Sequence, residues 1–138
     1  MIKNFVDIYM EHKGEMKDYF SKQHPEEYKD IVTKAVEIIA KYDKNYPTMD
    51  AENIHEINDG DYQGTLLYII PADKYQPDHY WAVFVDYGSC SGCDTLEAIR
   101  MYDDYDQTPK KEQVDDYMML ALHIVQHIKD ITNTEVGE

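Results

Sequence analysis

Basic residues are scarce in this sequence, and it also has few cysteines and no long apolar run. Its 138 residues include 13 Lys and Arg against 28 Asp and Glu, for a formal net charge of −15. This balance repels phosphate backbones and anionic lipids, so we expect no direct binding to nucleic acid and no docking on a membrane. No run approaches the ~20 apolar residues of a membrane-spanning helix. Residues 1–7 lack the apolar core of a signal peptide.

Cysteine occurs only twice, at Cys90 and Cys93. Two thiols three residues apart, with no signal peptide before them, are typical of a reducing compartment rather than of a disulfide-stabilised secreted domain. The chain is long enough to bury a hydrophobic core without disulfides or metal. We therefore expect a cytoplasmic protein that folds as a single domain over residues 1–138.

Acidic residues and tyrosines are present in excess. Residues 45–106 hold 13 of the acidic residues and only two bases, Lys74 and Arg100, so the middle of the chain carries most of the negative charge. Thirteen Tyr stand against three Phe and one Trp. Tyrosine suits positions where one end of the side chain is packed and the other is wet. An acidic exterior serves solubility in many proteins, and it also attracts basic surfaces.

The apolar spacing predicts helices on both sides of one hairpin. Helical periodicity at residues 2–22 and 25–43 indicates an antiparallel helix pair, and the same period recurs at residues 110–131. Aromatic and β-branched runs at residues 62–70 and 79–87 indicate two strands joined as an antiparallel hairpin. Shorter helices are expected from Thr48 through Ile57, and from Asp94 or Thr95 to Met101.

These elements predict an α+β fold. A small antiparallel β-hairpin or sheet is expected to be covered by the N-terminal helix pair and by two C-terminal helices. Within the single domain, residues 1–44 form the helical pair, and residues 45–101 form the hairpin with the cysteine loop and a short helix. Residues 110–131 form the C-terminal helix.

Both cysteines lie in a loop of small residues between the second strand and a short helix. Glycines there permit positive φ, and backbone N–H groups at a helix start favour a thiolate or a bound anion. In an antiparallel hairpin the start of one strand lies beside the end of the next, so Asp61 and Gln63 are expected to face this loop. The candidate ligand or structural site is Asp61, Gln63, Gly64, Gly88, Ser89, Cys90, Ser91, Gly92, Cys93 and Asp94.

Two motifs in this region carry a resemblance to known proteins. Asp61-Tyr62-Gln63-Gly64 and Gly88-Ser89-Cys90-Ser91-Gly92-Cys93-Asp94 resemble a signature of small uncharacterised phage and prophage proteins. The resemblance spans residues 59–100 and leaves out the helical ends. It implies a phage origin, hence the cytosol of a host cell, and it implies no particular activity.

Several interpretations of the two cysteines stay open. In the first interpretation, both cysteines are small buried side chains in a packed turn, since free cysteine is among the most buried residue types. In the second interpretation, the cysteines form a zinc half-site that His123 and His127 complete as a Cys2His2 set. Against it, 29 residues separate the two pairs, and both histidines lie opposite the apolar face of their helix. A redox or nucleophilic thiol, or a loop that binds a small ligand or anion, are the remaining interpretations.

The leading functional hypothesis is a binding protein rather than an enzyme. No catalytic residue is nominated, because carboxylate pairs arise by chance among 28 acids. We expect a phage-type accessory protein that binds a host macromolecule through an acidic, Tyr-rich surface and needs no cofactor. A basic, nucleic-acid-binding host protein is the expected type of partner. The alternative is a thiol-, zinc- or small-ligand-binding site centred on the Cys90–Cys93 loop.

Overall fold

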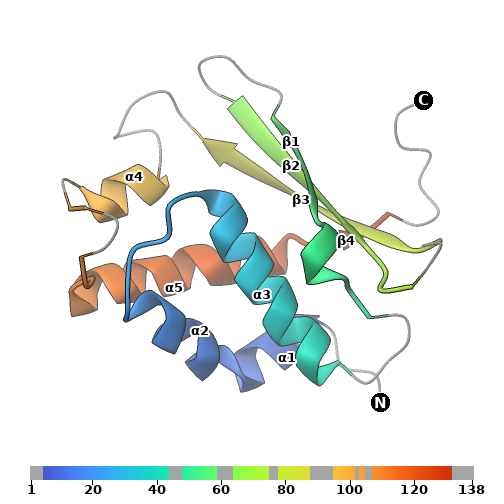
Figure 1. Cartoon of the computed structure of the whole chain (residues 1–138), viewed down its shortest axis with the longest axis horizontal. Helices are drawn as coiled ribbons and strands as arrows, with labels where there is room; N and C mark the ends of the chain where they lie inside the picture. Colours follow the sequence, from blue (N-terminus) through green and yellow to red (C-terminus); the bar gives the residue numbers. More distant parts are fainter. Residues whose placement is uncertain are drawn as a thin grey trace.

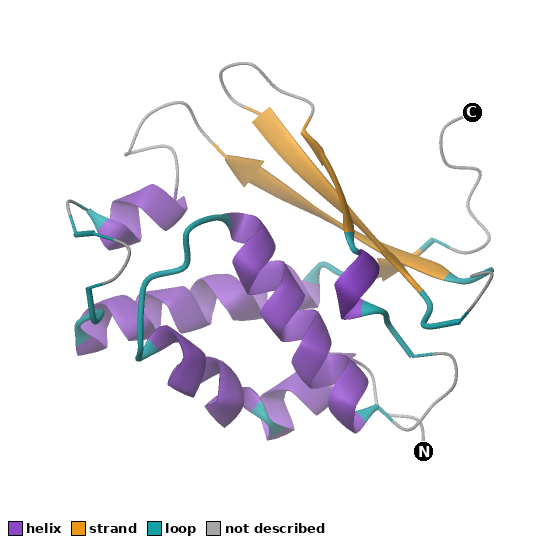
Figure 2. Cartoon of the chain, in the orientation of Figure 1, coloured by secondary structure: helices purple, strands orange, loops and turns teal. Residues whose placement is uncertain are grey.

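The computed structural model describes residues 5–43, 48–58, 64–74, 78–87, 95–101, 103–104 and 107–131. Within them, the helices lie on one face of an antiparallel sheet, so the predicted α+β fold is confirmed (Figures 1 and 2). None of the helices in these ranges is long and apolar enough to cross a membrane. The elements, in chain order, are α1 (Phe5–Glu11), α2 (Lys13–Phe20), α3 (Tyr28–Tyr42), the 3₁₀ turn η1 (Ala51–Asn53), β1 (His55–Asn58), β2 (Gly64–Pro71), β3 (Tyr80–Tyr87), α4 (Thr95–Arg100), α5 (Lys111–Gln126) and β4 (Lys129–Asp130).

The predicted hairpin forms the centre of the sheet. Strands β2 and β3 pair in register from Gly64 with Tyr87 to Pro71 with Tyr80, and the strand order is β1-β2-β3-β4. Because successive side chains of a strand point to opposite faces, every second residue can be buried under the helices. The buried residues of this face are Leu66, Tyr68, Ile70, Trp81, Val83 and Val85.

The predicted helix from Thr48 through Ile57 is wrong. Only η1 is helical, and the Asp50 carboxylate caps it by accepting a hydrogen bond from the Glu52 N–H at 3.0 Å. The chain then becomes β1, which pairs antiparallel with β2, with Ile57 opposite Leu67. The edge of β2 offers this segment a full set of backbone partners. A helix of about ten residues in isolation is marginal, so the pairing decides its structure.

The predicted single helix over residues 2–22 is also wrong, because the chain is broken at His12 between α1 and α2. The His12 backbone is not helical, and its ring stacks on the Tyr42 ring with the centroids 3.5 Å apart. The Glu15 carboxylate, one turn further along, accepts hydrogen bonds from the Tyr42 hydroxyl and from Lys41 Nζ. These contacts with the end of α3 compensate for the backbone hydrogen bonds lost at the break. The periodicity of residues 2–22 cannot reveal contacts with residues so far away in the sequence.

The C-terminal helix ends at Gln126, five residues before the predicted boundary at residue 131. Beyond it, Lys129 and Asp130 form β4 opposite Ala82 and Trp81. The Ile131 N–H also donates to the Tyr80 carbonyl oxygen at 3.0 Å. The apolar face predicted for this helix is confirmed over α5, where Met118 is half-buried and the other residues are buried: Val114, Tyr117, Ala121, Ile124 and Val125. Ile128, also predicted for this face, is buried but lies beyond the helix.

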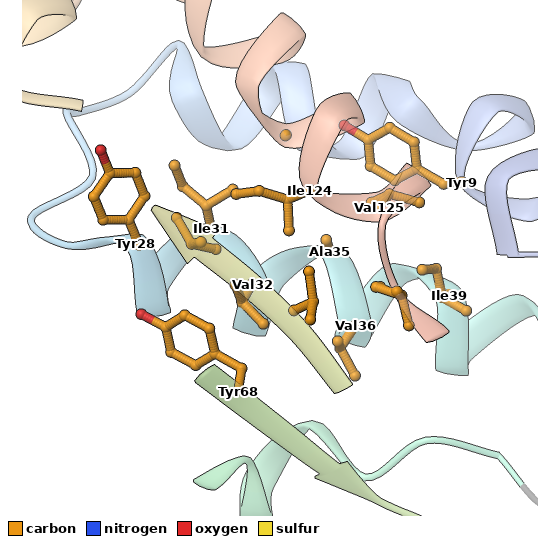
Figure 3. Packing of buried hydrophobic residues seen from close by; sticks show 14 of the residues in the cluster. Tyr9, Tyr28, Ile31, Val32, Ala35, Val36, Ile39, Tyr68, Ile124 and Val125 are labelled. Carbon is orange, nitrogen blue, oxygen red and sulfur yellow. The ribbon is translucent and has the colours of Figure 1, made fainter. Parts of the chain in front are cut away.

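Helix α3 lies at the centre of the hydrophobic core. It begins at Tyr28 rather than at the predicted Pro25, because Asp30 Oδ2 accepts hydrogen bonds from the backbone N–H groups of Glu26 and Glu27. Figure 3 shows its apolar side chains between Tyr68 of the sheet and Ile124 of α5. The buried residues of α3 are Tyr28, Ile31, Val32, Ala35, Val36, Ile38 and Ile39.

The face of the sheet turned away from the helices is more exposed than the inner face. Ile57, Leu67 and Phe84 lie opposite one another across three strands. Phe84 is 65% exposed and Ile57 is 40% exposed. The core therefore lies between the sheet and the helices, and this outer row contributes less to it.

Candidate functional site

The predicted cysteine-loop site falls almost entirely outside the described residues. Gly64 begins β2 and pairs with Tyr87 at the end of β3. The other nine predicted residues lie outside the described ranges, and their proximity to one another stays a prediction: Asp61, Gln63, Gly88, Ser89, Cys90, Ser91, Gly92, Cys93 and Asp94.

Helix α4, which follows the cysteine loop in the chain, is attached to two other helices. The Leu96 N–H donates to the Tyr28 hydroxyl oxygen at 3.1 Å, which links α4 to the start of α3. Gln113 Nε2 donates to the Ile99 carbonyl oxygen at 3.0 Å, which links the end of α4 to α5. The helix that follows the cysteine loop in the chain is therefore fixed against α3 and α5.

The histidines of the zinc interpretation lie where the sequence predicts. His123 and His127 are exposed on α5 and just after it, with their ring centroids 4.3 Å apart. His127 Nδ1 lies 2.7 Å from the His123 carbonyl oxygen. The described residues contain no group of three or more His, Cys, Asp or Glu that could hold a metal ion. Because both cysteines lie outside those residues, the Cys2His2 set stays a prediction.

A buried polar network links the α2–α3 connection and the α4–α5 connection to α5. The His24 ring and the Tyr117 ring are fully buried, and His24 Nδ1 lies 2.6 Å from the Tyr117 hydroxyl oxygen. His24 Nε2 lies 3.2 Å from Asp103 Oδ2. Gln113 Nε2 donates to the same Asp103 carboxylate at 3.0 Å, and Arg100 Nη1 donates to the Asp103 carbonyl oxygen.

The protonation of this network follows from its partners. The hydrogen bond from Gln113 lowers the pKa of Asp103, so its carboxylate is ionised and can only accept hydrogen bonds. The hydrogen of neutral His24 therefore lies on Nε2, facing Asp103, and Nδ1 accepts from the Tyr117 hydroxyl. Burial lowers the pKa of His24, although the negative charge of Asp103 acts in the opposite direction. Burial also raises the pKa of Tyr117.

The network connects three parts of the fold. His24 and Tyr117 have no exposed surface, whereas the Asp103 side chain is 26% exposed. The effect of the network is to hold the α2–α3 connection and the α4–α5 connection against α5. The sequence shows no signal for it, because 93 residues separate His24 from Tyr117.

We expect the stability of the protein to fall as the pH is lowered from 7 to 5. His24 has a lowered pKa in the folded state, so unfolded chains bind its proton more readily than folded chains. Its contribution is fully present above the ordinary histidine pKa of about 6.5 and is lost as the pH falls below it. Urea unfolding at pH 8, 7, 6 and 5 measures this slope. His24→Gln should flatten the slope, and an identical slope in this variant would contradict the assignment.

A cavity of about 420 Å³ lies between β3 and the C-terminal half of α5. Its inner wall is apolar and includes the buried side chains of Tyr28, Val85 and Ile124. Its outer wall is formed by exposed side chains, among them Phe84 and Lys129. The sequence does not predict this cavity, because the boundary between α5 and β4 creates it.

A second hollow, of about 360 Å³, lies between α1, α2 and the middle of α5. Methionines line it, and Met119 is 71% exposed. Lys13, Lys17 and Asp115 also line it, so its charges are mixed. Tyr9 lies in its wall with a buried hydroxyl that has no hydrogen-bond partner in the described part of the chain, and burial raises the pKa of Tyr9 to about 12.

Negative charge gathers at the end of the sheet where η1, β1 and the β2–β3 connection meet. Hydrogen bonds from the Asp50 N–H to Pro71 O and from the Asp73 N–H to Thr48 O bring these segments together. We call Asp50, Glu52, Glu56, Asp73 and Asp78 the acidic edge. Across residues 48–58, 64–74 and 78–87 the only Lys or Arg is Lys74. Its ammonium pairs with Asp78 at 3.2 Å.

Comparison with family models, curated proteins and solved structures finds no match to this chain. The resemblance to small phage and prophage proteins therefore stays a prediction that depends on the two motifs alone.

Proposed function

We propose that this protein is a phage-type accessory protein that binds a basic surface of a host protein. The contact surface is the acidic edge, and the reaction is reversible association rather than catalysis. A host protein that normally binds nucleic acid is the expected partner, because its Lys and Arg residues are already arranged to receive negative charge.

The observation that carries this proposal is the concentration of carboxylates at the acidic edge. Glu52, Glu56, Asp73 and Asp78 are exposed, and the nearby Lys74 is already paired with Asp78. Exposed charges of one sign raise the rate of encounter with a partner of opposite charge. Such an edge therefore favours a basic partner over an acidic or uncharged one.

Four of the tyrosines that the structure describes belong to the core rather than to this surface. Tyr9, Tyr28, Tyr68 and Tyr117 are buried, and the hydroxyl of Tyr68 donates to Glu56 at 2.7 Å. Among these four side chains, Tyr68 positions one carboxylate of the acidic edge from beneath it. The Tyr-rich part of the proposed surface stays a prediction.

Salt should weaken the proposed binding strongly. Proteins retained from a host lysate by the immobilised chain should be released as ionic strength rises from about 0.05 M to about 0.5 M, because exposed charges are screened over this range. The retained proteins should have basic surfaces. Retention that does not change with salt would contradict a mechanism based on charge.

A matched pair of variants separates the acidic edge from total charge. Glu52→Gln, Glu56→Gln and Asp73→Asn together should abolish most of the retention. Glu112→Gln, Asp115→Asn and Asp116→Asn together remove the same charge from the exposed side of α5 and should leave most of it intact. Equal losses in the two variants would show that the edge has no specific role.

A further inference from the structure

The cavity between β3 and α5 has a composition unlike the rest of this protein. Its described lining contains two imidazoles, His123 and His127, and one ammonium, Lys129, and includes no carboxylate. The chain as a whole has a net charge of −15. Lys129 therefore gives this cavity a positive charge, in a chain whose net charge is negative.

The sheet topology explains why the cavity stays open. In the described part of the chain, β4 pairs with β3 only at Trp81 and Ala82, whereas β3 continues to Tyr87. Helix α5 ends at Gln126, and the chain turns there into β4. The space beside Phe84 and Val85 is left between the helix and the sheet, with buried apolar atoms at its base.

The imidazole rings are held in place at the entrance. His127 Nδ1 donates to the His123 carbonyl oxygen at 2.7 Å, because a carbonyl can only accept. With its hydrogen on Nδ1, the neutral His127 ring has Nε2 as a hydrogen-bond acceptor. The His123 ring packs beside it, with 4.3 Å between the centroids. Lys129 follows two residues later and adds a full positive charge.

Size and chemistry together define the occupant. Small-molecule sites are apolar cavities of about 300–1,000 Å³ with a few convergent polar groups, and this cavity lies within that range. Asp130, which follows Lys129, pairs with His79 Nε2 at 2.8 Å. Exposed charges further away are screened over about 8 Å at physiological ionic strength, so Lys129 dominates the electrostatics at contact distance. An apolar group therefore fits the base of the cavity, and a carboxylate fits its entrance beside the Lys129 ammonium.

We propose that this cavity binds a small molecule that has an apolar body and a carboxylate. The apolar body lies against Val85, Ile124 and Phe84. The carboxylate lies at the entrance, near Lys129 and His123. This site shares no residue with the acidic edge.

Octanoate is a direct probe of the proposed site. Titration of the full chain, followed by NMR, should give saturable shifts of the Val85 and Ile124 methyl signals and of the His123 and His127 ring signals. Octylammonium, which has the same chain length and the opposite charge, should bind at least about tenfold more weakly. Octan-1-ol should fall between the two. Equal affinity for octanoate and octylammonium, or shifts confined to the hollow around Met119, would overturn the proposal.

Two exposed positions allow the contacts to be tested without disturbing the core. Lys129→Ala should weaken octanoate binding by about three- to fivefold, as expected for loss of an exposed ion pair, and should leave octan-1-ol unchanged. Phe84→Ala should weaken both ligands by about threefold, since it removes apolar contact area. Lys111→Ala, at the opposite end of α5, is the matched control and should have no effect. Octanoate affinity that is the same in all three variants would overturn the assignment.

Discussion

Phe20→Ala should reduce the free energy of unfolding by about 3–5 kcal/mol, the usual cost of deleting a buried phenylalanine ring. Phe20 is the last residue of α2, and its ring has no exposed surface. It packs on the Tyr117 ring of α5, with 5.2 Å between the centroids. The substitution therefore opens a cavity where α2 meets α5. Urea unfolding monitored by circular dichroism measures the loss.

Phe84→Ala is the matched control for this prediction, because it removes the same atoms from an exposed ring. Phe84 is 65% exposed and has Leu67 opposite it on β2. We expect a loss of less than about 1 kcal/mol, the range of a single cross-strand pair. If the two variants lost equal stability, the core would not lie between the helices and the inner face of the sheet.

Tyr117→Phe should reduce the free energy of unfolding by about 1–3 kcal/mol although it removes a single oxygen atom. The hydroxyl is the partner of His24 Nδ1 at 2.6 Å, and both side chains are fully buried. Water cannot replace the lost partner in this environment, so the histidine nitrogen keeps its full desolvation penalty. Urea unfolding at pH 8, where His24 is neutral, isolates this effect from protonation.

Tyr42→Phe provides the comparison for a hydroxyl near the surface. The Tyr42 hydroxyl donates to the Glu15 carboxylate, whose side chain is 34% exposed. Water can take over this hydrogen bond, so we expect a loss of about 1 kcal/mol or less. A larger loss for Tyr42→Phe than for Tyr117→Phe would show that the buried network contributes little to stability.

Local periodicity predicted those parts of the fold that are stabilised by one continuous apolar face. Helix α3 and the apolar face of α5 agree with it, because their buried positions repeat at helical spacing over four turns. Strands β2 and β3 agree as well, because a two-residue alternation places Leu66 and Tyr68 on the same face.

Partners distant in sequence decided the remaining elements. The break at His12 depends on Tyr42 at the end of α3. The strand His55–Asn58 and the strand Lys129–Asp130 depend on strands that pair with them. A segment of two to four residues contains too little periodicity to reveal a strand, so its structure follows from the backbone partners available to it.

Sequence alone determined the acidic character of this protein and its α+β class, because both follow from composition and from the spacing of apolar residues. The tertiary structure decided where charge gathers and where a cavity opens. The acidic edge and the basic entrance near Lys129 are each assembled from different segments. Their chemistry arises from contacts between these segments, and no single stretch of sequence contains it.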